Sequence, residues 1–272
     1  MTTLLDGGMG RELLRIGAPF RQPEWSALAL IEAPDRVVEA HHNFIEAGAE
    51  VITTNSYAVV PFHIGDERFR TSGHDLASSS GRLARKAAAA APHDVRVAGS
   101  LPPLFGSYRP DLFDAASAAD VIDPLVDALA PHVDHWLGET LGSIVEAITV
   151  RAALDRAGST MPLWLSFTLD DSRPGALRSG EPVELAVRTA IDLGATTIAF
   201  NCCPAETITD AVRIAAAVGG DLGWIRLVQL PQELANSATT MGPGQLAGPI
   251  ALAGGPRPSG PIACRRAARC RP

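Results

Sequence analysis

Residues 135–169 decide the fold and read HWLGETLGSIVEAITVRAALDRAGSTMPLWLSFTL. The stretch opens with a short apolar run that leads to Glu139. Residues 144–157 follow as the clearest helical stretch of the chain, and 163–169 form a second apolar run. Two short apolar runs separated by one helix indicate parallel strands with the helix packed outside them.

The same alternation continues on both sides of this unit. Further strands are expected at 4–5, 51–54, 95–99, 196–200 and 224–230, and further helices from Pro34 to Gly48 and at 83–91, 118–129, 183–193 and 205–218. A doubly wound sheet and a closed barrel both fit this order. We favour a (β/α)8 TIM-type barrel, because polar residues follow almost every strand and barrel enzymes gather such residues on one face. These residues are Asp6, Asn55, Ser100, Glu139, Asp170 and Asn201.

Composition restricts the class of protein. The chain has 272 residues, of which 46% are apolar, and a barrel takes about 250 residues. The net charge of −7 argues against nucleic acid and against an anionic membrane as partners. We find no apolar run long enough to span a bilayer and no basic segment before the first strand, so a cytoplasmic protein is expected.

The alternation stops in the C-terminal segment. From Leu234 to Pro272 there is no Asp, Glu, Lys or aromatic residue, and arginine provides all the charge. We therefore predict a barrel domain at 1–233, incomplete at its eighth strand, and an atypical tail at 234–272 that is out of frame or disordered. A barrel without an eighth strand leaves the first and seventh strands with open edges, which predicts self-association.

Four motifs stand in order at predicted strand ends. They are LDGGMGREL at 5–13, TTNSY at 53–57, the stretch from Val133-Asp134 through Glu139-Thr140 to Glu146-Ala147, and Asn201-Cys202. Taken together, over residues 3–230, they resemble the homocysteine S-methyltransferase family. The resemblance implies methyl transfer from a sulfonium or ammonium donor to the thiol of homocysteine, which gives methionine.

The resemblance also implies a zinc ion held by three cysteines, with the fourth position left for the substrate sulfur. A zinc-bound thiol ionises, and the thiolate is the nucleophile. Cys202 matches the first of these ligands, but the Gly-Gly-Cys-Cys motif that carries the other two is absent. Cys203 is a weak substitute, and Cys264 and Cys270 lie in the arginine-rich tail. The zinc site is therefore expected to be incomplete.

The resemblance places the homocysteine amine between Asp6 and Glu139. The amides of Gly7, Gly8 and Met9 form a candidate nest for its carboxylate. Tyr57 and Asn201 are the candidate catalytic residues: Tyr57 is expected to line the donor pocket and Asn201 to orient the turn. S-methylmethionine is the favoured donor, because the chain resembles the short, single-domain members, whereas betaine serves longer relatives.

Two other chemistries are weaker. A Schiff-base aldolase needs a lysine inside the barrel, and Lys86, the one lysine, is expected on the outside of a helix. His41 and His42 are expected on an outer helix, and His132 and His135 at the barrel face away from the chemistry, so a histidine metal site is not expected.

A catalytically inactive or truncated homologue is the alternative to an active enzyme. Zinc measurement on the purified protein separates the two hypotheses. About one zinc per chain, lost in Cys202→Ala, supports the enzyme, and a folded barrel without zinc supports the inactive homologue.

The first prediction concerns the gene. If the segment after 223–235 is out of frame, translation of the other two forward frames from those codons gives an apolar strand followed by Gly-Gly-Cys-Cys. The GC-rich composition of the tail, with Pro, Gly, Ala and Arg in excess, is the reason for this expectation. Absence of the motif from both frames refutes the frame shift.

Overall fold

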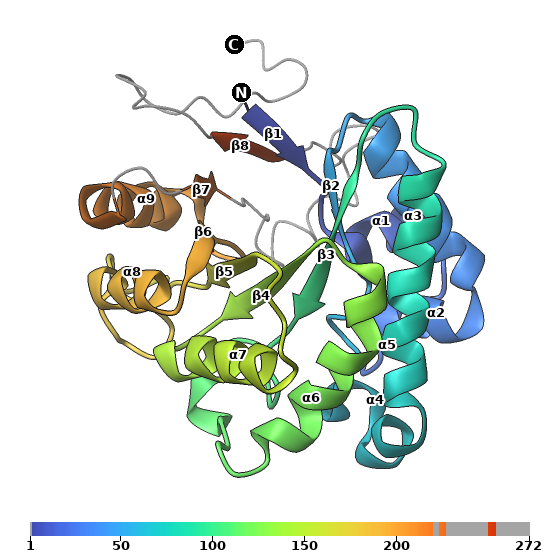
Figure 1. Ribbon diagram of the computed structural model, residues 1–272, viewed down its shortest axis with the longest axis horizontal. Coiled ribbons are helices and arrows are strands. Elements are labelled where there is room, and N and C mark those ends of the chain that lie inside the picture. The colour runs from blue at the N-terminus through green and yellow to red at the C-terminus, as the bar shows by residue number, and fades with distance from the viewer. Residues whose placement is uncertain (1, 220–222, 227–249, 254–272) are drawn as a thin grey trace.

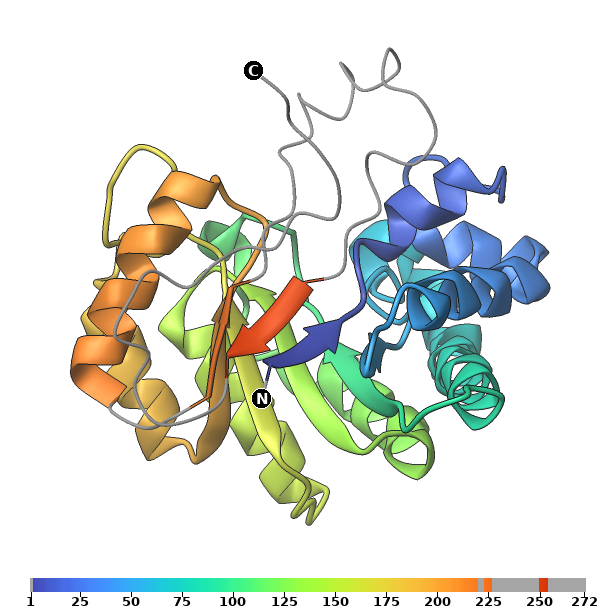
Figure 2. The ribbon, with the colours of Figure 1, turned by 90° about the horizontal axis from the view of Figure 1, so that it is seen from above.

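The computed structural model describes residues 2–219, 223–226 and 250–253. Its strands form a ring, and its helices lie mainly on the outside of that ring (Figures 1 and 2). The strands are β1 (Thr2–Leu5), β2 (Val51–Thr53), β3 (Arg96–Leu101), β4 (His135–Leu141), β5 (Leu163–Phe167), β6 (Ala195–Phe200), β7 (Gly223–Arg226) and β8 (Ile250–Ala253). The helices are α1 (Met9–Arg15), α2 (Ser26–Glu32), α3 (Pro34–Glu46), α4 (Pro61–Ile64), α5 (Asp66–Ala89), α6 (Ala118–Leu129), α7 (Ile144–Arg156), α8 (Val183–Asp192) and α9 (Ala205–Gly219), with 3-10 turns η1 (Pro110–Leu112) and η2 (Ala130–His132).

The predicted α/β barrel is confirmed, with one departure in its last strand. Strands β1 to β7 pair in sequence order and run parallel, while β8 runs antiparallel to both β7 and β1. Figure 2 shows β8 beside β1. The ring therefore closes without an eighth parallel strand among the described residues, so the barrel is incomplete as a (β/α)8 structure.

The expectation of open edges on the first and seventh strands is wrong. Thr2 to Leu5 of β1 pair with Ala253 to Ile250 of β8, and Ile225 of β7 pairs with Leu252. These pairs occupy the edges, so they remove the reason given for self-association, which itself stays a prediction. β8 lies within the segment 234–272, and the other residues of that segment are outside the described ranges. The boundary at residue 233 stays a prediction.

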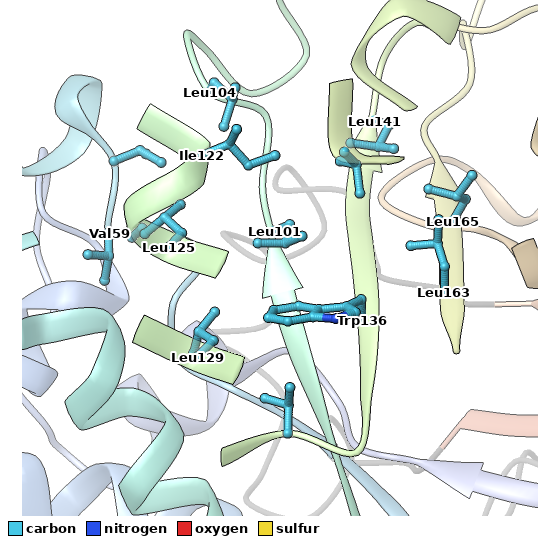
Figure 3. Close-up of a cluster of buried hydrophobic side chains, with 14 of the residues drawn as sticks. Val59, Leu101, Leu104, Ile122, Leu125, Leu129, Trp136, Leu141, Leu163 and Leu165 are labelled. Carbon is cyan, nitrogen blue, oxygen red and sulfur yellow. The ribbon is translucent and has the colours of Figure 1, made fainter. Parts of the chain in front are cut away.

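A large apolar cluster fills the space between the strands and the helices. Figure 3 shows Leu101 of β3 and Trp136 of β4 on the side of the sheet that faces Leu125 and Leu129 of α6. All four side chains are at most 2% exposed. Burial of one such leucine side chain stabilises the fold by about 1.5–3 kcal/mol. α6 remains helical although it contains Pro124, because its apolar face is buried in this cluster.

A second, smaller cluster lies inside the ring, to which six strands contribute one residue each: Leu5, Val51, Ala98, Leu137, Trp164 and Ala199. Side chains two residues apart on a strand point to the same side. The residues two positions later on β2 to β6 therefore also face the barrel interior, nearer its C-terminal end. They are Thr53, Ser100, Glu139, Ser166 and Asn201, and all of them are polar.

Helix α5 is longer than its sequence suggests. We expected a helix at 83–91, whereas α5 begins at Asp66. Gly73 and Gly81 disfavour a helix by propensity, yet both are buried. A Cβ atom on Gly81 would lie 2.8 Å from the Cβ atom of His132, so glycine permits the close approach of η2 to α5. Helices α1, α2 and α4 were also not anticipated, because they are only 4–7 residues long.

None of the helices in the described part of the chain combines the length and the apolar character needed to cross a membrane. The longest, α5, has 24 residues but carries charged residues along its length.

The second prediction concerns this close approach. Gly81→Ala gains up to about 1 kcal/mol of helix propensity. The new Cβ atom, however, lies too close to the Cβ atom of His132, which cannot move away without a shift of the backbone. Overpacking of this kind costs about 1–3 kcal/mol, so we expect a net loss of unfolding free energy in urea.

Gly73→Ala provides the comparison for Gly81→Ala. Its new Cβ atom would meet the ring of Phe69, at 2.8 Å from Cδ2, and a ring can rotate away. We expect a smaller loss in Gly73→Ala than in Gly81→Ala. Equal or greater stability of Gly81→Ala relative to the unchanged chain contradicts the packing account.

Candidate active site

The predicted site residues come together at the C-terminal end of the barrel. Asp6 follows β1, Glu139 lies in β4, and Asn201 and Cys202 follow β6. Parallel strands present these ends on the same face, so residues distant in sequence become neighbours. Hydrogen bonds and charge interactions, described below, link all four to one polar region.

Asp6 is held by strand β2. Its carboxylate accepts hydrogen bonds from the backbone N–H of Thr53 at 2.6 Å and from the Thr53 hydroxyl at 3.1 Å. Burial raises the pKa of Asp6 to about 8, and the charge of Glu139 adds to this rise while the Thr53 hydrogen bonds oppose it. The two carboxyl groups are therefore close enough to interact.

Glu139 lies in β4, three strands from β1 in the ring. Ser100 of β3 donates a hydrogen bond to its Oε2 at 2.6 Å, and burial raises the pKa of its carboxyl group. Within the described ranges, neither Asp6 nor Glu139 forms an ion pair with a basic side chain. Two interacting carboxylates without a counter-charge are a suitable site for a cation.

Gly7, Gly8 and Met9 connect Asp6 to helix α1. Gly8 precedes the helix, which begins at Met9. A Cβ atom on Gly7 would lie 2.9 Å from Cε1 of Phe44, so a larger residue would displace that ring. The three residues are partly exposed next to Asp6, and their role as a carboxylate nest stays a prediction.

Cys202 lies at the end of β6 in a left-handed conformation, with φ of 57°. Its Sγ atom receives hydrogen bonds from Asn201 Nδ2 at 3.2 Å and from the Thr140 hydroxyl at 3.7 Å, and its thiol also bonds the Tyr108 hydroxyl. Burial raises the pKa of the thiol to about 12, and the charge of Glu139 acts in the same direction. Without a cation beside it, the Cys202 thiol therefore keeps its proton at neutral pH.

Asn201 is fixed by partners on two neighbouring strands, β4 and β5. Its Oδ1 accepts a hydrogen bond from Ser166 at 2.7 Å, and its Nδ2 donates to the Thr140 hydroxyl at 2.8 Å. Its backbone N–H bonds the carbonyl of Phe167. The side chain is 3% exposed, and these partners fit the orienting role expected for it.

Tyr57 stands next to this network. Its hydroxyl bonds Ser107 Oγ at 2.8 Å. Burial raises the pKa of its phenol, and the neighbouring Cys202 and Glu139 act in the same direction. Its place beside Cys202 agrees with a position in the donor pocket, which stays a prediction.

Tyr108 was not among the site residues expected from the sequence. This residue lies in the loop between β3 and α6, which has no periodic pattern, and nothing in the sequence marked it. Its side chain is 43% exposed, and its hydroxyl reaches Cys202. The guanidinium of Arg178, also not anticipated, lies 5.4 Å from the centre of its ring.

Three of the four non-glycine residues with positive φ in the described chain lie at this site. The non-glycine residues with left-handed φ in the described chain are Trp25, Tyr108, Thr140 and Cys202. The last three contact one another through the Cys202 thiol. Such conformations cost about 1–3 kcal/mol each and persist only where surrounding contacts enforce them, which they do mainly at functional sites.

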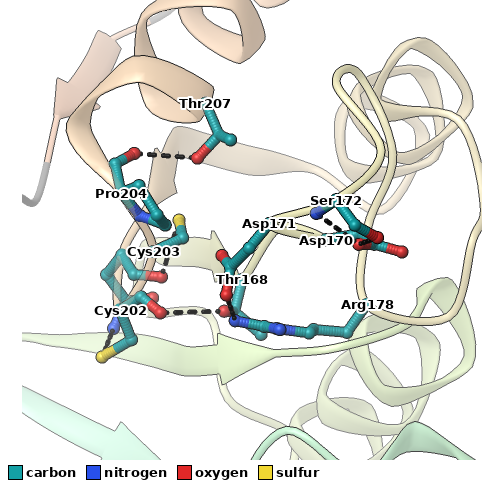
Figure 4. Close-up of polar contacts among 10 residues, drawn as sticks. Thr168, Asp170, Asp171, Ser172, Arg178, Cys202, Cys203, Pro204 and Thr207 are labelled. Carbon is teal, nitrogen blue, oxygen red and sulfur yellow. Dashed lines mark hydrogen bonds and ion pairs between the residues drawn. The ribbon is translucent and has the colours of Figure 1, made fainter. Parts of the chain in front are cut away.

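Cys203 belongs to a different environment from Cys202. Its thiol points away from that of Cys202 (Figure 4) and donates a hydrogen bond to the carbonyl of Asn201 at 3.2 Å. The side chain is 3% exposed within the apolar cluster, and burial raises the pKa of its thiol to about 11. Cys203 is therefore oriented for packing rather than for sharing a ligand with Cys202.

The described residues do not fit the three-cysteine zinc site. Among them, no group of three or more His, Cys, Asp or Glu side chains is arranged to hold a metal ion. Among the described residues, Cys202 is the one cysteine whose thiol faces the polar side chains at the C-terminal end of the barrel. Cys264 and Cys270 lie outside the described ranges. We therefore assign no reaction step to zinc.

Two of the histidines, His41 and His135, are buried in other parts of the fold. His41 is fully buried in α3, and burial lowers its pKa to about 3. His135 begins β4 at the opposite end of the barrel, with its ring 4.0 Å from that of Trp164, and burial lowers its pKa to about 4.

The third prediction concerns the pH dependence of stability. The folded-state pKa of Asp6, about 8, exceeds the ordinary value of 3.8, so between these values the folded chain binds more protons than the unfolded chain. This carboxyl group therefore makes unfolding free energy fall as pH rises from about 4 to about 8, by at most about 1.4 kcal/mol per pH unit.

Asp6→Asn removes this contribution while keeping an acceptor for Thr53. We expect the unfolding free energy of Asp6→Asn, measured in urea from pH 5 to pH 8.5, to decline less than that of the unchanged chain. Parallel pH profiles of the two proteins refute the raised pKa.

A family model and known proteins match this chain in sequence. The model of the family "Homocysteine S-methyltransferase" matches residues 3–250. A homocysteine S-methyltransferase of Escherichia coli (strain K12) is 32% identical over 232 residues, which cover 77% of this chain and 72% of that protein. A selenocysteine Se-methyltransferase of Brassica oleracea var. italica is 25% identical over 242 residues, which cover 77% of this chain and 67% of that protein.

Solved structures show the same architecture. The crystal structure of the metallated form of the homocysteine methyltransferase MmuM from Escherichia coli superposes with a TM-score of 0.73 at 28% sequence identity, over 87% of this chain and 86% of that one. The family match includes the strand ends that carry Asp6, Glu139 and Cys202, and it extends to residue 250. The chain belongs to the homocysteine S-methyltransferase family.

Proposed function

We propose that this chain binds homocysteine with its amino group between Asp6 and Glu139 and transfers a methyl group to its thiol. Membership of the family supports methyl transfer to homocysteine. The observation that carries the binding site is the pair of interacting carboxylates without a basic partner among the described residues.

An ammonium group complements this pair. Each carboxylate is already oriented by a hydroxyl or amide donor, Asp6 by Thr53 and Glu139 by Ser100. A cation between them lowers both pKa values, because the charged forms gain an attractive partner. Binding of the ammonium therefore releases the proton that Asp6 holds at neutral pH.

The other groups of homocysteine have candidate partners on either side. The amides at Gly7 to Met9 adjoin Asp6 and are the proposed donors to the carboxylate. The thiol then points across the ring towards Cys202, which is partly exposed and lies within range of the Glu139 charge. This orientation leaves Tyr57 and Tyr108 beside the reacting sulfur.

We favour S-methylmethionine as the methyl donor, on the resemblance to the short, single-domain members of the family. In that reaction one S–CH3 bond of the sulfonium breaks and a new S–CH3 bond forms on homocysteine. The sulfonium loses its positive charge, the thiol loses its proton, and two molecules of methionine result. Tyrosine rings and a carboxylate suit a sulfonium, since both attract cations.

The fourth prediction tests the ammonium site. Glu139→Gln keeps the shape and the Ser100 hydrogen bond but removes the charge. A hydrogen bond to a charged group contributes about 1.5–3 kcal/mol, so we expect the Kd for homocysteine to rise about 10- to 150-fold. Isothermal titration with reduced homocysteine measures it, and the KM for homocysteine should rise in parallel.

Two controls separate charge recognition from damage to the fold. Glu184→Gln changes an exposed carboxylate of α8 that pairs with Arg188, and it should leave the Kd unchanged. 4-Mercaptobutanoate, which is homocysteine without the amine, should bind the unchanged chain weakly and Glu139→Gln equally weakly. An unchanged homocysteine Kd in a folded Glu139→Gln variant removes Glu139 from the site.

A further inference from the structure

Arg178 and Tyr108 form a cationic and aromatic pair beside the proposed methyl-transfer site, and neither residue has a role in the binding of homocysteine described above. Arg178 lies in the segment between β5 and α8, and Tyr108 in the loop between β3 and α6. The guanidinium lies over the tyrosine ring, with its Cζ atom 5.4 Å from the ring centre. This distance is within the range of a cation–π contact.

The position of Tyr108 is enforced from both sides. Its backbone φ is 63°, which is unfavourable for a bulky residue, and its hydroxyl bonds Cys202. The preceding residue, Ser107, bonds the hydroxyl of Tyr57. The loop therefore holds the Tyr108 hydroxyl at the Cys202 thiol and bonds the Tyr57 hydroxyl through Ser107, with a left-handed backbone at Tyr108.

The position of Arg178 is enforced by its own loop. The bridges Leu169 with Leu177 and Ala176 with Pro182 fold the segment back on itself. One guanidinium nitrogen of Arg178 bonds Asp171 at 2.8 Å. In Figure 4 the side chain extends from this loop towards Cys202.

Arg178 still has hydrogen-bonding capacity. A guanidinium has five N–H donors, and Nε of Arg178 is buried without a partner among the described residues. The planar fork of arginine matches a carboxylate, and a buried donor without an acceptor is costly. The Arg178 side chain as a whole is 25% exposed, and we infer that an anion approaches the guanidinium from this exposed side.

We propose that Arg178, supported by Tyr108, binds the carboxylate of an amino-acid methyl donor, a sulfonium such as S-methylmethionine. This inference rests on the proposed function and adds the donor subsite to it. Homocysteine uses Asp6, Glu139 and the Gly7 amide region at strands β1 and β4. Arg178 approaches from beyond β5, so an anion there projects its sulfonium end towards Cys202 and Tyr57.

The test compares two ligands and a set of variants by isothermal titration. The ligands are S-methylmethionine and (3-aminopropyl)dimethylsulfonium, which is the same molecule without its carboxylate. The unchanged chain should bind S-methylmethionine about 10- to 100-fold more tightly than the decarboxylated ligand. Arg178→Met should abolish this preference by weakening S-methylmethionine alone.

Further variants keep the test decisive if Arg178→Met does not fold. Tyr108→Leu removes the ring over which Arg178 lies and should reduce the preference, whereas Tyr108→Phe retains the ring and should retain it. Arg173→Met removes an exposed arginine of the same loop and should leave both Kd values unchanged. Arg178→Lys keeps the charge without the fork and should give an intermediate preference.

The outcomes distinguish this inference from the proposed function. Equal binding of the two sulfonium ligands by the unchanged chain overturns the inference, as does a preference that persists in Arg178→Met. Weakened homocysteine binding in Arg178→Met, with S-methylmethionine unaffected, also overturns it, because the guanidinium then serves the acceptor. Failure of the unchanged chain to bind homocysteine refutes the proposed function, whereas the carboxylate preference is read from the sulfonium ligands alone.

Discussion

The alternation of side chains along parallel strands is the constraint on which the site depends. Six strands each place one apolar residue inside the ring, and these residues form one buried cluster. Two residues later, strands β2 to β6 place a polar side chain on the same side. This apolar cluster lies on the side of the polar residues that faces the N-terminal end of the barrel. The carboxyl groups of Asp6 and Glu139 are therefore buried next to a surface that cannot solvate them. Their raised pKa values follow from this arrangement.

The region around Cys202 shows how the chain maintains a strained arrangement. Hydrogen bonds run from Ser166 to Asn201, from Asn201 to Thr140, and from Thr140 to the Cys202 thiol. Thr140 and Cys202 both have left-handed backbones, and each is fixed by partners from other strands. The strain at these positions is thus offset by hydrogen bonds among the ends of β4, β5 and β6. This explains why the thiol is directed into the polar region while that of the adjacent Cys203 is directed into the core.

The parts of the site that the sequence predicts are those set by periodicity. Asp6, Glu139, Asn201 and Cys202 stand at the ends of apolar runs, and parallel topology brings such ends together without any further information. Tyr108 and Arg178 come from loops, where position depends on tertiary contacts such as the Cys202 and Asp171 hydrogen bonds. No spacing rule could have located them.

The errors in the fold prediction have similar causes. Helix α5 was recognised only in its last third, because Gly73 and Gly81 are poor helix formers that are present for close packing against Phe69 and His132. The closing strand β8 has four residues and is antiparallel, and it lies in a segment whose sequence shows no strand–helix alternation, so the pattern that identified the other strands did not mark it. At Gly81 and in β8, local propensity fails because a contact distant in sequence determines the structure.

A crystal structure of the chain with homocysteine bound tests the central claim most directly. The account predicts that the amino nitrogen lies about 2.7–3.2 Å from a carboxylate oxygen of Asp6 and of Glu139, with the sulfur directed towards Cys202. An amino group bound elsewhere, with water or no ligand between the two carboxylates, would contradict the account.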